Sequence, residues 1–219
     1  MNDHLPDGSA RLDLDRVRRI DIPEAVYCAG KTTDQSVAIV DRMLSAGEDA
    51  VLATRTTEEQ RAALRRLAEP AAEGGTSLLW RPRPDSGRSV AVVSAGTSDL
   101  PVAHECRLAL TAFGHRTALV TDVGVAGLHR LTTALPEIRP HEVIVAIAGM
   151  EGALPTVLAG LVRQPIVAVP TSVGYGTSFE GVTALLSMMS SCSPGVSVVG
   201  IDNGYGAACA VHRILGARP

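Results

Sequence analysis

Aromatic side chains make up only 3% of this 219-residue sequence, too few to offer the stacking platforms on which single-stranded nucleic acid binds. Neither sign of charge is in large excess, since the formal net charge is −3. A nucleic-acid partner and a charge-driven partner are therefore unexpected. Apolar runs stay shorter than the roughly 18 residues that cross a bilayer, and the polar opening "MNDHLPDGSARLDLD" does not resemble a secretory signal. We expect a cytoplasmic enzyme with no membrane partner.

Cysteine is sparse as well, and its spacing argues against a structural zinc site of the CxxC type. The four cysteines are Cys28, Cys106, Cys192 and Cys209, and reduced thiols are expected in a cytosolic protein. Cys192 is unusual because it lies in the turn "SSCSPG", between an apolar helical run and a strand-like run. A helix C-terminus does not favour a thiolate, so a reactive Cys192 needs a cation, which a substrate could supply.

The linker-like stretch "RPRPDSGRS" divides the sequence into two predicted domains, 1–84 and 85–219. The first alternates strand patterns ("EAVYCAG", "AVLATR", "TSLLWRP") with two helical patterns, of which one begins with a capping box of Thr32 and Gln35. A leading helix is expected over 13–20. These patterns predict a small α/β domain.

The second block contains five short, continuous, β-branched runs: "SVAVVSAG", "RTALVTD", "EVIVAIAG", "PIVAVPT" and "VSVVGID". Runs that are apolar throughout suit strands buried on both faces of a parallel sheet. Helical patterns separate them, and a last one closes the chain. The sequence therefore predicts a three-layer, doubly wound α/β domain with sheet order 2-1-3-4-5.

A polar, glycine-rich cluster follows each of the five predicted strands, and the carboxyl ends of parallel strands share one edge where ligands bind. Small residues and a helix N-cap at Ser98 or Asp99 suit a phosphate or carboxylate, although a capped helix without a ligand fits equally. The candidate binding residues are Ser94, Gly96, Thr97, Ser98, Asp99, Asp122, His129, Gly149, Thr171, Ser172, Gly174, Tyr175, Gly176, Asp202 and Asn203.

Several of these residues have a plain structural alternative. Asp122 and Asp202 could hold ribose hydroxyls or simply cap turns, and His129 could be an acid/base or a surface residue. Tyr175 could close over a planar ligand or be an exposed loop residue. Glu151, in "AGMEGALP", is either a favourable first-turn charge or a general base whose apolar surroundings raise its pKa.

The second block resembles the PurE-type aminoimidazole ribonucleotide carboxylases in "SAGTSD", in the segment starting "VIVAIAGMEGALP" and in "CSPGVSVVGIDNGYGAA". Across nearly the whole chain it is more similar to the LarB family, the pyridinium-3,5-biscarboxylic acid mononucleotide synthases of nickel-pincer cofactor assembly. Seven motifs in order carry this resemblance: "VYCAGKT", "SAGTSDLPVA", "DVGVAGLHRL", "AGMEGALPTV", "PTSVGYG", "LLSMMSSCSPGV" and "IDNGYGAA".

The resemblance implies an enzyme that carboxylates C5 of nicotinic acid adenine dinucleotide with CO2 and then hydrolyses its phosphoanhydride, releasing AMP. It implies that Cys192 attacks the pyridinium ring and that Glu151 takes part in catalysis. No tightly bound cofactor is expected, CO2 or bicarbonate is the co-substrate, and a Mg²⁺ held mainly by phosphates would leave little trace in sequence. Homo-oligomers, and octamers by analogy with PurE, are implied as well.

"GLHRLTT" departs from the A-H-R-T-P motif that carries the catalytic histidine of PurE enzymes, which puts a PurE-like role of His129 in doubt. Two alternatives stay open beside the LarB-like reaction. One is a PurE-like carboxylase or mutase acting on an imidazole ribonucleotide. The other is a non-catalytic nucleotide-binding module in which Cys192 is only structural.

Overall fold

The computed structural model describes Leu5 and residues 10–216. The chain divides into two compact units, Met1–Pro84 with Thr111–Gly114 and Asp85–Leu110 with His115–Pro219. No helix in the described part of the chain combines the length and the apolar character needed to cross a membrane.

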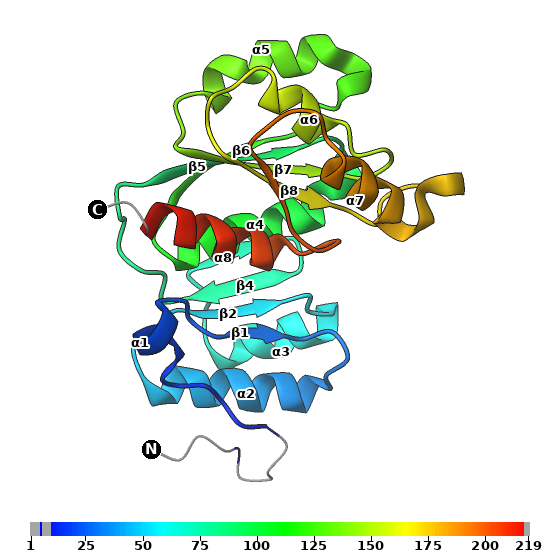
Figure 1. The fold of residues 1–219 in the computed structure, drawn as a ribbon. Coiled ribbons are helices and arrows are strands. Elements are labelled where there is room, and N and C mark those ends of the chain that lie inside the picture. Colours follow the sequence, from blue (N-terminus) through cyan, green and yellow to red (C-terminus); the bar gives the residue numbers. More distant parts are fainter. Residues whose placement is uncertain (1–4, 6–9, 217–219) are drawn as a thin grey trace. The chain divides into compact units, whose positions relative to one another are not determined.

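The N-terminal unit is a small α/β fold on a mixed sheet (Figure 1). Its strands run in the order β1-β2-β4-β3, with β1 parallel to β2 and the other two pairs antiparallel. Helices α2 and α3 pack their apolar residues into one core with the sheet. The elements are α1 (Arg16–Ile20), β1 (Ala25–Tyr27), α2 (Thr33–Ala46), β2 (Val51–Thr54), α3 (Glu58–Leu67), β3 (Ala72–Gly74) and β4 (Ser77–Trp80).

The capping box predicted at the start of α2 is present, with the Thr32 hydroxyl accepting from the backbone N–H of Gln35. Two expectations in this unit need correction. The leading helix begins at Arg16 instead of at Asp13, because Asp15 has φ −98° and ψ 5°, which are not helical values. Strand β3 was not expected, because "AEG" lacks the β-branched residues that mark a strand in sequence.

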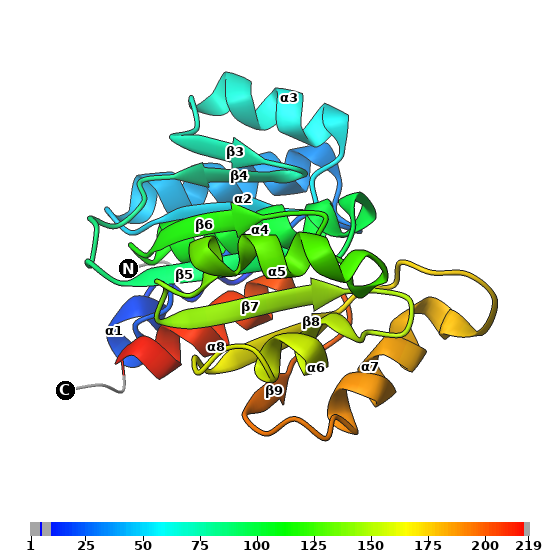
Figure 2. The same ribbon diagram turned by 90° about the horizontal axis from the view of Figure 1, so that it is seen from above.

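The C-terminal unit has five strands, all parallel, in the order β6-β5-β7-β8-β9. This order confirms the predicted 2-1-3-4-5 arrangement. In Figures 1 and 2, α4 and α8 lie on one face of the sheet, while α5, α6 and α7 lie on the other. The elements are β5 (Ser89–Ser94), α4 (Leu100–Ala112), β6 (Arg116–Val120), α5 (Leu128–Ile138), β7 (Val143–Ala148), α6 (Leu154–Ala159), β8 (Ile166–Pro170), α7 (Val182–Met189), β9 (Val196–Val198) and α8 (Gly204–Gly216).

The central strands of this sheet are covered on both faces, which explains why they read as unbroken apolar runs. Every residue of β7 and β8 is buried. On the α5–α7 side, apolar residues of these helices form one core with β5, β7 and β8. This rigid centre holds the connections that leave the carboxyl ends of the strands.

Candidate functional site

Five connections leave the carboxyl ends of the parallel strands, and the topology brings them to one edge of the sheet, here called the carboxyl edge. Short 3₁₀ turns shape three of them: η1 (Thr97–Asp99), η2 (Val125–Gly127) and η3 (Gly176–Gly181). All candidate binding residues except Ser94 and His129 lie on these connections. The connections are 95–99, 121–127, 149–153, 171–181 and 199–203.

Backbone strain gathers at the carboxyl edge. Asp122, Met150 and Asp202 have left-handed φ values of 57°, 53° and 56°, and each lies within a few residues of the end of its strand. A left-handed conformation is costly for residues other than glycine, and it persists where the surrounding structure enforces it. Phe179 and Glu180, on the connection after β8, also have left-handed φ values, of 44° and 50°. Five such residues at one edge mark it as the candidate functional site of the C-terminal unit.

Asp99 lies at the centre of this edge and is 3% exposed. Its Oδ2 accepts from the Gly96 N–H at 2.9 Å, and its Oδ1 accepts from the Thr171 hydroxyl at 2.7 Å. Burial raises the pKa of Asp99, while hydrogen bonds from Thr171, Gly96 and Gly149 oppose that rise. The expected helix N-cap at Ser98 or Asp99 is wrong, because both residues lie inside η1 and Gly96 precedes it.

The turn that carries Glu151 packs tightly against the connection after β8. The Gly152 N–H donates to the Gly149 carbonyl at 2.9 Å, and the Met150 N–H donates to the Val173 carbonyl at 2.8 Å. Glu151 itself is exposed. The apolar surroundings expected from its sequence neighbours therefore do not enclose its carboxylate.

The connections after β8 and β9 are joined by Asp202. Its carboxylate accepts from the Ser172 N–H at 2.8 Å, and its backbone N–H donates to the Pro170 carbonyl at 2.8 Å. The Asn203 side chain accepts from the Gly206 N–H at 2.7 Å, which caps the first turn of α8. For Asp202 and Asn203 the structure thus shows turn and cap roles.

The Asp122 carboxylate forms an ion pair with Arg130 in the first turn of α5. Sequence reasoning chose His129, which is exposed and lies one residue earlier. It missed Arg130, although a signal was present: the five connections contain no Lys or Arg, so Arg130 is the nearest cation in sequence to any of them. The pair places one guanidinium at the carboxyl edge.

The remaining candidates differ widely in exposure. Ser94 ends β5 fully buried, and its hydroxyl finds no hydrogen-bond partner among the described residues. Tyr175 is 81% exposed in the connection that contains Gly174 and Gly176. Thr97 and Ser98 are exposed in η1.

Cys192 does not lie on the carboxyl edge. It lies on the connection from α7 into β9, and a connection that enters a parallel strand belongs to the opposite edge of the sheet. Gly195 of this connection accepts a hydrogen bond from the N–H of Ile166, the first residue of β8. The thiol is free and exposed.

Thr156 in α6 fixes the connection that carries Cys192. Its hydroxyl donates to the Ser191 hydroxyl at 2.8 Å, and its carbonyl accepts from the Ser193 hydroxyl at 2.9 Å. Helix α6 begins three residues after Glu151, so one short helix separates the two predicted catalytic side chains. A cavity of about 280 Å³ adjoins this connection, lined by Leu185, Met188, Met189, Ser191, Ser193, Val196 and Val198.

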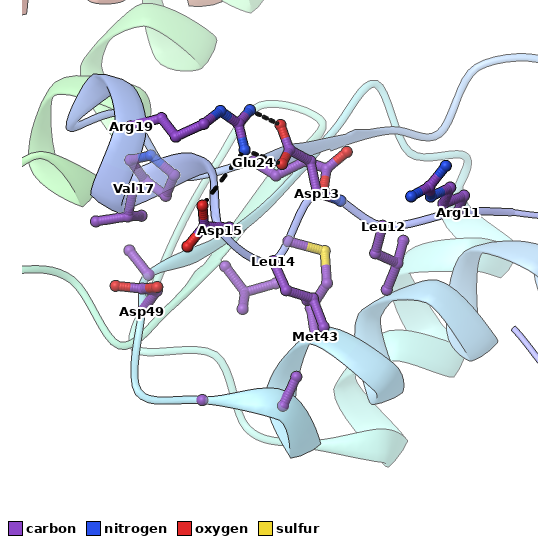
Figure 3. Close-up of a pocket in the computed structure, with 15 residues that line it drawn as sticks. Arg11, Leu12, Asp13, Leu14, Asp15, Val17, Arg19, Glu24, Met43 and Asp49 are labelled. Carbon is purple, nitrogen blue, oxygen red and sulfur yellow. Dashed lines mark hydrogen bonds and ion pairs between the residues drawn. The ribbon is translucent and has the colours of Figure 1, made fainter. Parts of the chain in front are cut away.

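A larger cavity, of about 600 Å³, lies in the N-terminal unit (Figure 3). Its floor is apolar, with Leu12 and Met43 among the lining residues. The Arg19 guanidinium at its rim is paired with Asp13 and Asp15, which lowers the pKa of Asp13 through a hydrogen bond and charge attraction. Its volume exceeds that of the cavity near Cys192, but it contains none of the predicted binding residues, so we place the candidate site at the carboxyl edge.

No group of three or more His, Cys, Asp or Glu side chains that could hold a metal ion occurs within Leu5 and residues 10–216.

Comparison with known proteins matches the N-terminal and the C-terminal part of the chain to two families. Residues 89–219 match the family described as AIR carboxylase, and residues 5–74 match the LarB/PurE-like N-terminal domain. The chain belongs to the LarB-like family. An uncharacterized protein of Methanocaldococcus jannaschii is 36% identical over 209 residues, which cover 90% of this chain and 80% of that protein.

Proteins named N5-carboxyaminoimidazole ribonucleotide mutase match a shorter part of this LarB-like chain. The one from Methanocaldococcus jannaschii is 34% identical over 131 residues, covering 58% of this chain and 78% of its own. The one from Pyrococcus horikoshii is 33% identical over 137 residues, covering 59% and 73%. The family is thus of the carboxylase and mutase type, and this LarB-like chain is an enzyme of that type.

Proposed function

We propose that this LarB-like protein carboxylates the pyridinium ring of nicotinic acid adenine dinucleotide at C5 and hydrolyses the phosphoanhydride of the product, as in nickel-pincer nucleotide assembly. The match of both domains to LarB and AIR carboxylase models is the observation that carries the proposal. CO2 or bicarbonate is the co-substrate. The products are AMP and pyridinium-3,5-biscarboxylic acid mononucleotide.

In this proposal the Cys192 thiolate adds to C4 of the ring, and the electron pair of the broken π bond neutralises the ring nitrogen. The resulting dihydropyridine is an enamine, so its C5 attacks CO2 and forms the new C–C bond. Glu151 removes the C5 proton, and the ring nitrogen then expels the thiolate from C4, which restores the pyridinium. A water molecule finally cleaves the phosphoanhydride.

Both side chains are exposed, which these roles require, but within one chain they lie on connections at opposite edges of the sheet. A pyridinium ring is itself the cation that a thiolate at a helix C-terminus needs. Arg130, close to the strained Asp122, is our candidate for an anionic group of the substrate.

The proposal includes a Mg²⁺ held mainly by the phosphates of the dinucleotide. It includes no tightly bound cofactor.

We also propose that the protein self-associates. Phe179, Val182, Leu186 and Met189 are 67%, 43%, 59% and 68% exposed and lie on and just before α7, which contains no charged residue. Apolar surface of this kind is typical of protein–protein contacts.

The test is incubation with nicotinic acid adenine dinucleotide, bicarbonate and Mg²⁺, followed by mass spectrometry. We expect AMP and a mononucleotide heavier by one carboxylate. The variant Cys192→Ser should lose carboxylation while keeping its circular dichroism spectrum; wild-type activity in that variant would exclude the covalent route. Absence of AMP under varied metal and pH would refute the proposal.

A second candidate, mutase activity on an imidazole ribonucleotide, is favoured by the three named mutases among the relatives. Turnover of N5-carboxyaminoimidazole ribonucleotide in a parallel assay would establish it. Tight dinucleotide binding without turnover, unchanged by Cys192→Ala, would point instead to a nucleotide-binding module.

A further inference from the structure

The two serines on either side of Cys192 are both bound to one residue of α6. The Thr156 hydroxyl donates to the Ser191 hydroxyl at 2.8 Å, and the Ser193 hydroxyl donates to the Thr156 carbonyl at 2.9 Å. The Ser193 N–H also donates to the Ser191 hydroxyl oxygen, at 3.2 Å. These three hydrogen bonds, here called the hydroxyl clamp, join α6 to a turn that follows 35 to 37 residues later in the sequence.

The hydroxyl clamp determines which way the Cys192 side chain points. Ser191 and Ser193 are half-buried, whereas Cys192, between them, is exposed. Because Thr156 binds both neighbours, the thiol between them is directed away from α6 and into solvent. Without these bonds the turn would have little to fix its backbone, since Gly195, with a φ of 86°, follows it closely.

Helix α6 is itself fixed in the C-terminal unit. Its residues Leu154, Pro155 and Leu158 are buried, and the two leucines belong to the core on this side of the sheet. Figure 2 shows α6 close to β9, the strand that follows the Cys192 turn. The turn is therefore held against a rigid element, and its movement requires the hydroxyl clamp to break.

We propose that Thr156 is a positioning residue, whose hydroxyl and carbonyl hold the Cys192 turn so that the thiol points outward. Its effect on turnover rests on the proposed function, but its effect on the turn does not. Thr156 does not touch the substrate in this proposal. Loss of positioning lowers kcat, because the thiol is no longer held in one orientation, whereas binding of the dinucleotide and hence KM change little.

The first experiment measures amide hydrogen exchange of peptides covering residues 190–196 in the full chain. Thr156→Val removes the hydroxyl at nearly constant shape, and we expect the Ser193 amide to exchange about tenfold faster. Thr156→Ser keeps the hydroxyl and should exchange at close to the wild-type rate. The matched control is Thr132→Val, on α5, because the Thr132 hydroxyl donates to the His129 carbonyl in its own helix.

A second pair of variants tests the other link of the hydroxyl clamp. Ser193→Ala removes the bond to the Thr156 carbonyl and should also accelerate exchange of this turn. Ser190→Ala should not, because the Ser190 hydroxyl donates to carbonyls within α7. This pair decides alone should Thr156→Val fail to fold. Unchanged exchange in both Thr156→Val and Ser193→Ala overturns the proposal, as does equal acceleration by Thr132→Val.

The second experiment is kinetic. Thr156→Val should lower kcat about tenfold and change the dinucleotide KM less than about threefold, and Thr156→Ser should restore kcat. Retained kcat in Thr156→Val, together with faster exchange, would overturn the positioning role and leave the hydroxyl clamp a purely structural feature. A raised KM with retained kcat would make Thr156 a substrate ligand. An inactive wild type refutes the proposed function, and exchange still decides whether Thr156 holds the turn.

Discussion

Replacing Gly149 by alanine should destabilise the carboxyl edge by about 2–3 kcal/mol. The new Cβ would lie 2.2 Å from the Val173 carbonyl oxygen and 2.7 Å from the Thr171 hydroxyl oxygen. A carbon atom and a carbonyl oxygen normally stay about 3.3 Å apart, so the Val173 carbonyl must move by about 1 Å. That movement lengthens its 2.8 Å bond from the Met150 N–H.

The magnitude combines three effects. Overpacking costs about 1–3 kcal/mol, and loss of a buried hydrogen bond costs about 1 kcal/mol. The smaller entropy of the unfolded alanine chain offsets about 0.4–1 kcal/mol. Gly149 has no left-handed φ, so the backbone itself adds no strain.

Urea unfolding followed by far-UV circular dichroism measures the loss. Fluorescence of the single tryptophan, Trp80, would report β4 of the N-terminal unit instead. The control is Gly160→Ala at the end of α6, where a Cβ meets only the Val157 carbonyl, at 3.5 Å. We expect this control to be neutral or slightly stabilised. A loss below about 0.5 kcal/mol for Gly149→Ala, or equal stability of the two variants, would refute the reasoning.

Three further outcomes are expected. Native iodoacetamide labelling should modify exposed Cys192 well before Cys28 and Cys106, because burial raises the pKa of both of those thiols; preferential labelling of either contradicts the fold. Burial also raises the pKa of Asp99 above its ordinary value of 3.8. The protonated carboxyl therefore stabilises the folded state below about pH 4, and this contribution is lost as the pH rises through the pKa of the folded state. Asp99→Asn should therefore gain stability relative to wild type in urea titrations as pH is raised from about 3.5 to about 6, and a trend in the opposite direction would exclude a raised pKa. Arg130→Ala should raise the dinucleotide KM about tenfold or more, with Arg130→Lys intermediate, and an unchanged KM removes Arg130 from the binding site.

The order of the five-stranded sheet could be predicted because its central strands are buried on both faces and so contain unbroken β-branched runs. The capping box of Thr32 and Gln35 could be predicted as well, since its two residues are only three positions apart in sequence. Strand β3 could not be predicted, because "AEG" becomes a strand only through pairing with β4. Such non-local pairing leaves no periodic pattern in sequence.

The candidate site, like the fold, could be predicted from the sequence only in part. Predicted topology alone identifies the connections of the carboxyl edge. The hydrogen bond between Thr171 and Asp99 could not be predicted, because the two residues are 72 positions apart in sequence. Arg130 is the cation nearest to these connections in sequence, but its pairing with Asp122 becomes visible only in the fold. The position of Cys192 opposite the carboxyl edge was deducible, since a residue that precedes a strand lies at the end where that strand begins.

Charge distribution at the carboxyl edge bears on how a dinucleotide would bind. Asp99, Asp122, Glu151 and Asp202 bring four carboxyl groups to the edge or its strand ends, and Arg130 is already paired with Asp122. Such an environment favours a cationic pyridinium ring and disfavours a diphosphate. Binding of the diphosphate therefore requires added positive charge, which a Mg²⁺ on its oxygens would provide.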